Sequence, residues 1–160
     1  MSSNTIFSTH RLHNQTVLVT GASGGIGRAT ALLYARAGAN VVLTARRLDA
    51  LEAVKKECEA ANAEGQSGAG GKYAVLTLDV TKRDEMDALL GKLPDWAKPV
   101  HILINNSGLV LGVDKVGSID PDEIDTMLNT NVRGLIHMTQ LFVKHFKERN
   151  QGHIVQLGSM

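Results

Sequence analysis

Four glycines lie close together near the start of the chain, within the stretch TVLVTGASGGIGR at residues 16–28. Gly21, Gly24, Gly25 and Gly27 follow a short apolar run and precede a segment with helical periodicity. Glycine allows the backbone to turn tightly and to approach a phosphate closely, and the free N–H groups of a helix start attract negative charge. A tight turn without a ligand is the alternative, but this position between a strand and a helix predicts dinucleotide binding.

A second kind of phosphate-binding loop, the P-loop of nucleotide hydrolases, does not fit the same residues. That loop needs a lysine after its last glycine and then Ser or Thr, because the lysine reaches the outer phosphates and the hydroxyl holds magnesium. Here Arg28 and Ala29 follow Gly27. Nucleotide hydrolysis is therefore a poor interpretation of this loop.

Two arginines, Arg46 and Arg47, predict which dinucleotide would bind. In dinucleotide folds an acid about twenty residues beyond the glycines binds the ribose 2′-hydroxyl of NAD, whereas an arginine accommodates the 2′-phosphate of NADP. The stretch VVLTARRL has no acid, and guanidinium groups can bind phosphate through two hydrogen bonds. We predict NADP, the alternative being two solvated arginines that open a helix. No carboxylate precedes Asp49, which either favours an anionic ligand or reflects chance in a short window.

These residues would be positioned by short apolar segments that alternate with helical ones. Strands are expected at 16–20, 40–44, 72–78, 101–104 and 153–157, and helices at 25–37, 48–63, 82–92 and 121–149. This alternation predicts an α/β fold, a doubly wound parallel sheet of Rossmann type with helices on both faces. Residues 15–160 are expected to form this domain and residues 1–14 a flexible tail.

Several residues mark helix ends or one helix face. Gly38 is expected to close the first helix, and Asp120, Pro121 and Glu123 read as an N-cap, an N1 proline and a capping-box partner. Asn131 lies on an apolar stripe expected to face the core, together with Ile124, Met127, Leu128, Leu135, Thr139 and Phe142. A buried amide must find hydrogen-bond partners. The alternative for this position is a capped kink between two helices.

Composition limits the remaining possibilities. With 160 residues, 43% of them hydrophobic, and a net charge of +1, the chain fits one globular domain and favours neither nucleic acid nor a membrane as partner. Cys58 is the only cysteine, and we expect a buried, inert thiol. The six histidines show no ligand spacing, so no metal site is expected. The opening residues lack a secretory apolar core, and we expect a cytoplasmic protein.

The stretch TGASGGIG resembles the cofactor loop of the short-chain dehydrogenase/reductase family, and further motifs follow in the order of that family. They are LDV at 78–80, NNSG at 105–108, NTNVRG around Asn131, and GHIVQLGS ending at Ser159. The resemblance covers residues 16–159. Within the family, LGVDKVGSI at 111–119 and IVQLGS are most similar to the branch of NADP-dependent 3-hydroxy acid dehydrogenases.

The resemblance implies an oxidoreductase that transfers hydride between NADP(H) and a small hydroxy or carbonyl compound. It implies cofactor contacts from Gly21, Ser23, Gly25, Ile26, Gly27, Arg46, Arg47, Asp79, Val80 and Asn105. Asp79 would lie beside the adenine and Asn105 beside the adenosine ribose, although Asp79 alone could equally be a helix N-cap. The family usually has alanine where this chain has Ser107.

The resemblance also implies part of a catalytic site. Members of the family use four catalytic residues, Tyr, Lys, Ser and Asn. The lysine lowers the pKa of the tyrosine, so that the tyrosine can exchange a proton. Ser159 and Asn131 match the last two roles, and neither Tyr34 nor Tyr73 has a lysine four residues further on. We therefore expect the cofactor part of an enzyme that is truncated, inactive alone and homo-oligomeric when complete, with an exposed apolar edge at 153–157. The alternative is a non-catalytic NADP-binding protein or an inactive truncated product.

Overall fold

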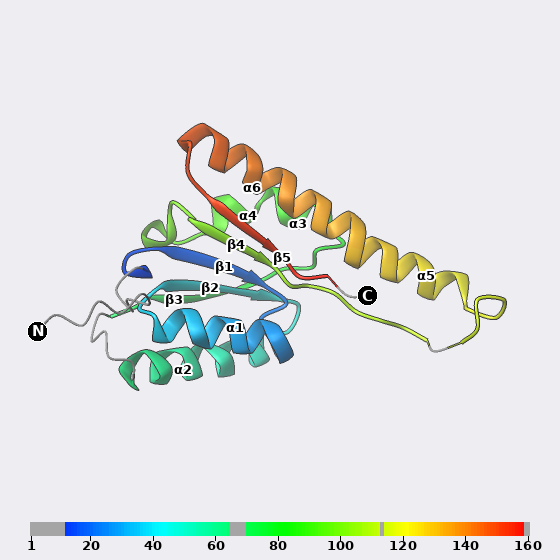
Figure 1. Ribbon diagram of the computed structural model, residues 1–160, viewed down its shortest axis with the longest axis horizontal. Helices are drawn as coiled ribbons and strands as arrows, with labels where there is room; N and C mark the ends of the chain where they lie inside the picture. Colours follow the sequence, from blue (N-terminus) through cyan, green and yellow to red (C-terminus); the bar gives the residue numbers. More distant parts are fainter. Residues whose placement is uncertain (1–11, 65–69, 113, 159–160) are drawn as a thin grey trace, which may run out of the picture.

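The computed structural model describes residues 12–64, 70–112 and 114–158, and its centre is a five-stranded sheet (Figure 1). The strands are β1 (Thr16–Thr20), β2 (Asn40–Ala45), β3 (Tyr73–Thr77), β4 (Ile102–Asn105) and β5 (His153–Gln156). All neighbours pair in parallel, in the order β3-β2-β1-β4-β5. The predicted Rossmann-type parallel sheet is confirmed, since this order is that of dinucleotide-binding folds.

Helices cover both faces of the sheet, as predicted (Figure 1). One face carries α1 (Gly25–Arg36) and α2 (Leu48–Glu64). The other carries α3 (Arg83–Asp87), α4 (Leu89–Lys92) and α6 (Leu135–Arg149), with a short 3₁₀ helix at Asp95–Ala97. The helix expected at 82–92 is thus two short helices that meet at Ala88.

Alternation along the strands builds one apolar core on each face. Val17 and Val19 of β1 pack with Leu51 of α2, whereas Leu18 packs with Phe142 of α6. All five side chains have no exposed surface. Successive strand residues point to opposite faces, so a strand that is apolar throughout must be covered on both sides. Each such side chain stabilises the fold by roughly 1.5–3 kcal/mol relative to its exposed state.

The helix expected at 121–149 has three parts. α5 (Pro121–Leu128) leads into a π-helical segment at Asn129–Gly134, which continues into α6. Gly134 of this segment packs closely against the loop after β3, because a Cβ on Gly134 would lie 2.6 Å from the Val80 carbonyl oxygen. Single π-helical turns often occur at functional sites.

The prediction that the apolar stripe at 121–149 faces the core is wrong for the first half of this long helix. Ile124 and Leu128 are 40% and 49% exposed, and Asn131 is exposed as well. The buried residues are spaced four apart and are Thr130, Gly134, Met138, Phe142 and Phe146. Figure 1 shows the reason: α5 extends past the sheet, and none of its residues is buried.

The helix ends largely follow the sequence. The Asp120 side chain accepts the Asp122 N–H, with Pro121 in the first turn, and Gly38 has a φ of +80° after α1. The capping-box role of Glu123 is not observed, because the described hydrogen bonds include none from the Asp120 N–H to the Glu123 carboxylate. The Glu123 carboxylate lies instead beside Gly112.

Cys58 is fully buried on α2, as predicted. Burial, together with the charges of Glu57 and Glu59, raises the pKa of its thiol to about 12, so the reactive thiolate is scarce at neutral pH. No helix in the described part of the chain is both long and apolar enough to cross a bilayer. Of the predicted tail, residues 1–11 lie outside the described part, and Leu12 packs against the core that contains Val17.

Candidate functional site

A cleft of about 1190 Å³ lies at the carboxyl ends of the strands. The sequence-predicted residues that line it are Gly21, Ser23, Gly25, Ile26, Arg46, Arg47, Asp79, Val80 and Asn131. Gly27 and Asn105 do not line it. Ser159 lies outside the described residues, and Leu157 and Gly158 before it are part of the cleft wall. The cleft therefore joins the glycine loop, the arginines and the helix segment around Asn131.

The glycine loop has the backbone that only glycine adopts readily. Gly21 has a φ of +63° and Gly25 a φ of +52°. Gly27 serves a different purpose, since a Cβ there would overlap the Gly21 carbonyl oxygen and Asn106 Nδ2. Gly27 thus does not line the cleft; its lack of a side chain allows the start of α1 to pack closely against Gly21 and Asn106.

The start of α1 is open toward the cleft. Its N-cap residue is Gly24, which has no side chain, and the first helical bond runs from the Arg28 N–H to the Gly24 carbonyl oxygen at 3.1 Å. No side chain among the described residues caps this end, and both Gly25 and Ile26 line the cleft. Unpaired N–H groups and the positive end of the helix dipole make such a terminus suited to an anion.

Two residues beneath the loop, Thr20 and Asn106, tie β1 to β4. Thr20 Oγ1 donates to the Ile104 carbonyl oxygen and accepts the N–H groups of Asn106 and Ser107, each at 3.0 Å. Asn106 Nδ2 donates to the carbonyl oxygens of Thr20 and Gly21. Sequence reasoning assigned neither residue a role, although both belong to the motifs TGASGGIG and NNSG. One sequence signal could have identified them: Thr20 and Asn106 lie at the carboxyl ends of β1 and β4, which meet at the same edge of the parallel sheet.

Asn105 was predicted to contact the cofactor, but its side chain points away from the cleft. It is 3% exposed, and its Nδ2 donates to Thr139 Oγ1 at 3.1 Å and to Gln156 Oε1 at 2.9 Å. Gln156 Nε2 also donates to Thr139 Oγ1, at 2.7 Å. Because residues two apart on a strand share a face, Asn105 points with Leu103 toward α6. The side chain of Asn105 therefore faces α6 and not the cleft, and a place for this residue beside a ribose stays a prediction.

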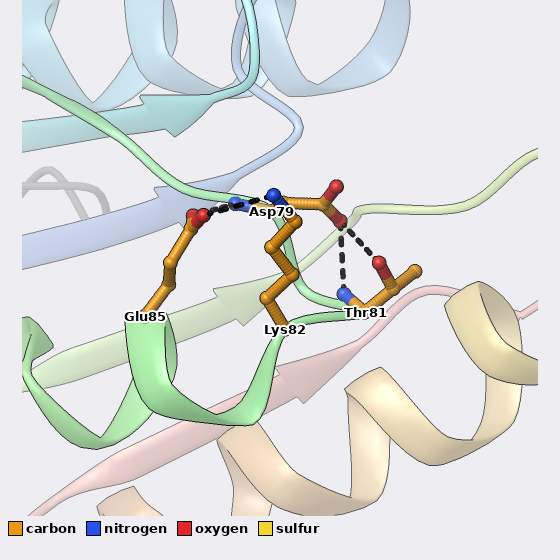
Figure 2. Close-up of polar contacts among 4 residues, drawn as sticks. All are labelled: Asp79, Thr81, Lys82 and Glu85. Carbon is orange, nitrogen blue, oxygen red and sulfur yellow. Dashed lines mark hydrogen bonds and ion pairs between the residues drawn. The ribbon is translucent and has the colours of Figure 1, made fainter.

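Asp79 faces the cleft just after β3, within a loop shown in Figure 2. Its Oδ1 accepts the N–H of Thr81 at 2.9 Å and the hydroxyl of Thr81 at 2.7 Å. Partial burial raises the pKa of the Asp79 carboxyl, but the two bonds from Thr81 and the charges of Arg46 and Lys82 outweigh it and hold the pKa below its ordinary value. The alternative role of helix N-cap is wrong, since Lys82 holds that position.

Asn131 reaches the same cleft from the π-helical segment. Its Nδ2 donates to the Leu109 carbonyl oxygen at 2.7 Å, and its Oδ1 accepts the Leu109 N–H at 2.9 Å. The amide is thus satisfied by the backbone of the loop after β4, although the residue is exposed rather than buried. Across the described ranges, no group of three or more His, Cys, Asp or Glu side chains is placed to hold a metal ion.

A parallel sheet in this order, with a glycine loop after β1 and a cleft at the carboxyl ends of its strands, defines a Rossmann-type α/β protein. Residues 15–160 match the family described as short chain dehydrogenase, and the chain belongs to this family. The resemblance found in the sequence motifs is confirmed.

The relatives and solved structures show how far the likeness extends. An NADP-dependent 3-hydroxy acid dehydrogenase of Schizosaccharomyces pombe is 37% identical over 155 residues, which are 94% of this chain and 56% of that protein. The closed form of a serine dehydrogenase complexed with NADP+ superposes with a TM-score of 0.80 at 33% identity, over 91% of this chain and 54% of that one. A metagenomic short-chain oxidoreductase in complex with NADP gives 0.82 at 30% identity, over 93% and 64%. The chain spans about half the length of the curated relatives it matches.

Proposed function

We propose that this chain is the NADP-binding part of a short-chain oxidoreductase. The observation that carries the proposal is one cleft that contains both the open start of α1 and the side chains of Arg46 and Arg47. Similar proteins named NADP-dependent or complexed with NADP support the same cofactor. The cofactor would supply or accept the hydride, and the protein would supply binding, orientation and a proton.

The residues present fit such a cofactor. The absence of a side chain at Gly27 lets the glycine loop pack close to Asn106, and the free N–H groups at the start of α1, which opens to the cleft, would bind the pyrophosphate. Arg46 and Arg47 are exposed in the cleft and would bind the 2′-phosphate. The ionised Asp79 carboxylate would accept a hydrogen bond from the adenine amino group. Asn105 would support the cleft by joining β4 to α6, because its side chain faces α6.

The catalytic part of the proposal rests on the family pattern. Asn131 lines the cleft, and Ser159 would hold the substrate oxygen. Neither Tyr34 nor Tyr73 lines the cleft, so neither is placed to exchange a proton with a substrate there. We expect no turnover from this chain by itself, which is also the outcome that a purely NADP-binding protein would give.

For the substrate class, the relatives alone give support. Small hydroxy or carbonyl compounds fit the family, and a 3-hydroxy acid is suggested by the names of several relatives. The cytoplasmic location and the homo-oligomeric state of the complete protein stay predictions from the sequence.

The test of the cofactor assignment is the substitution Arg46→Asp. The affinity for NADPH, followed by fluorescence titration, should fall by about tenfold or more, since a carboxylate repels the 2′-phosphate that the guanidinium binds. The affinity for NADH should change little. Arg36→Asp is the matched control, because Arg36 lies in the last turn of α1 and does not line the cleft. An equal loss of NADPH and NADH affinity in Arg46→Asp would show the assignment to be wrong.

A further inference from the structure

We propose that Glu85 is a positioning residue for the adenine side of the cleft: its carboxylate holds the backbone of Asp79 so that the Asp79 carboxylate faces the ligand. The inference rests on the proposed function, because it concerns how the same cleft recognises the base.

The contact that carries the inference runs backwards from α3 to the end of β3. Glu85 stands in the first turn of α3, and its Oε2 accepts the Asp79 N–H at 2.8 Å (Figure 2). Lys82 Nζ lies 3.6 Å from Oε1 of the same carboxylate. Glu85 is half-buried, so this bond is partly shielded from water and its loss would not be fully compensated by solvent.

With this bond, Asp79 is fixed at three points. Its N–H is held by Glu85, its carbonyl oxygen accepts the Lys82 N–H at 3.0 Å, and its Oδ1 is held by Thr81. The second carboxylate oxygen points away from both Thr81 and Glu85 (Figure 2). One acceptor of fixed direction therefore remains for a ligand, and a hydrogen bond to an ionised acceptor is among the stronger ones in proteins.

The same bond also controls the wall of the cleft. Val80, the next residue, lines the cleft, is 7% exposed, and lies against Gly134 of the π-helical segment. Ladder-type bonding from β2 reaches only as far as the Leu78 N–H, which donates to the Ala45 carbonyl oxygen. The next N–H along the chain, that of Asp79, donates instead to the side chain of Glu85. Loss of the Glu85 carboxylate would therefore make the backbone at Asp79 and Val80 more mobile, at the point where it would contact the adenine of the cofactor.

A different role for Glu85 would be purely structural, since an acid in the first turn stabilises a helix through its dipole. Asp84 is the matched control for that role. It is an exposed acid in the same turn of α3, and the structure gives its side chain no hydrogen bond to the loop at 79–82. Asp84→Ala and Glu85→Ala remove the same charge from the same helix end, but only Glu85→Ala removes the acceptor of the Asp79 N–H.

The experiment compares two cofactors on each variant of the purified protein. The probes are NADPH and reduced nicotinamide hypoxanthine dinucleotide phosphate, whose base has a carbonyl in place of the adenine amino group. The wild-type protein should bind NADPH about tenfold more tightly, because the exocyclic amino group of adenine can donate to the Asp79 carboxylate, whereas hypoxanthine presents a carbonyl oxygen at that position. In Glu85→Ala this ratio of dissociation constants should fall below about twofold, while Asp84→Ala keeps it.

Two further variants separate positioning from stability. Glu85→Gln retains an acceptor oxygen and should keep the ratio, whereas Glu85→Asp retains the charge but is one methylene shorter and should lose it. Glu85→Asp also replaces Glu85→Ala as the decisive variant should the alanine protein fail to fold. An unchanged ratio in folded Glu85→Ala or Glu85→Asp, or a wild-type ratio near one, overturns the inference. A wild-type protein that binds neither dinucleotide refutes the proposed function instead.

Discussion

Strands β1 and β5 both lead to the cleft, yet they are held in different ways. Every residue of β1 is buried, with exposed fractions between 0% and 2%. β5 pairs only with β4 at one edge of the described sheet, and His153 and Gln156 at its ends are exposed. The glycine loop is thus positioned by a strand buried on both faces, whereas β5 and Leu157 after it are only half-buried against the two cores, and polar contacts add to their attachment.

The polar contacts of β5 form a closed group around one hydroxyl. Thr139 Oγ1 accepts bonds from Asn105 Nδ2 and Gln156 Nε2 and donates to the Leu135 carbonyl oxygen. This group links β4, β5 and α6. An edge strand has a backbone ladder on one side only, so these side-chain bonds add to the attachment of β5. We therefore expect changes near β1 to act on the whole fold and changes near β5 to act locally.

The largest effect is expected from Gly27→Ala, beside the loop after β1. The new Cβ would overlap the Gly21 carbonyl oxygen and Asn106 Nδ2, which forces α1 away from β4. We expect a loss of about 3 kcal/mol in the free energy of unfolding, measured by urea denaturation, and loss of NADPH binding. In Gly24→Ala, where a Cβ meets nothing within 4 Å, stability should stay within about 0.5 kcal/mol of the wild-type value. Equal losses in the two variants would contradict the packing argument.

A smaller and more local effect is expected from Thr139→Val, at the centre of the group that holds β5. The methyl group keeps the shape but removes the shared acceptor, so Asn105 Nδ2 retains only Gln156 as partner. The free energy of unfolding should fall by about 1–2 kcal/mol. Hydrogen exchange should become faster at the Leu157 N–H, which bonds to Asn105 O, and not at the N–H groups of β1. Thr126→Val on the exposed face of α5 is the control, and faster exchange throughout β1 would remove the distinction between the strands.

The smallest effect concerns His101, which touches the start of both strands. Its Nδ1 accepts the Thr16 N–H of β1 at 3.0 Å, while its carbonyl oxygen accepts the His153 N–H of β5. Burial, and then the charges of Arg149 and His145, lower the pKa of His101 below 6.5. As the pH falls below 6.5, the unfolded chain takes up the proton first, so this stability is present at neutral pH and is lost in mild acid.

The measurement is the difference in unfolding free energy between pH 7.5 and 5.5. His101→Asn should reduce this difference by about 0.5–1 kcal/mol, because the amide oxygen can accept the Thr16 N–H at either pH. His153→Asn, at an exposed position on β5, should leave it unchanged. A pH dependence that His101→Asn does not alter would show that the imidazole bond to β1 does not matter for stability.

Much of the framework could be predicted because it depends on local pattern. The five strands start and end within one or two residues of their expected bounds, since each is a short apolar run bounded by glycine, polar residues or proline. The glycine loop and the Arg46–Arg47 pair were identified because spacing along one chain places them at one edge of a parallel sheet. The exposure of Asn131 was missed because helical periodicity does not show that this turn of the helix lines an open cleft.

Residue type and spacing along the chain are enough to predict the order of strands and helices, the turn at Gly21 and the positive charge at the cleft. Which side chains line the cleft and which support it depends on how the elements pack. Asn105 faces α6, Thr20 and Asn106 join strands that are far apart in sequence, and Glu85 holds Asp79. The physical reason is that hydrophobic patterns specify a face, whereas a hydrogen bond requires a donor and an acceptor about 3 Å apart, which only the packed fold sets.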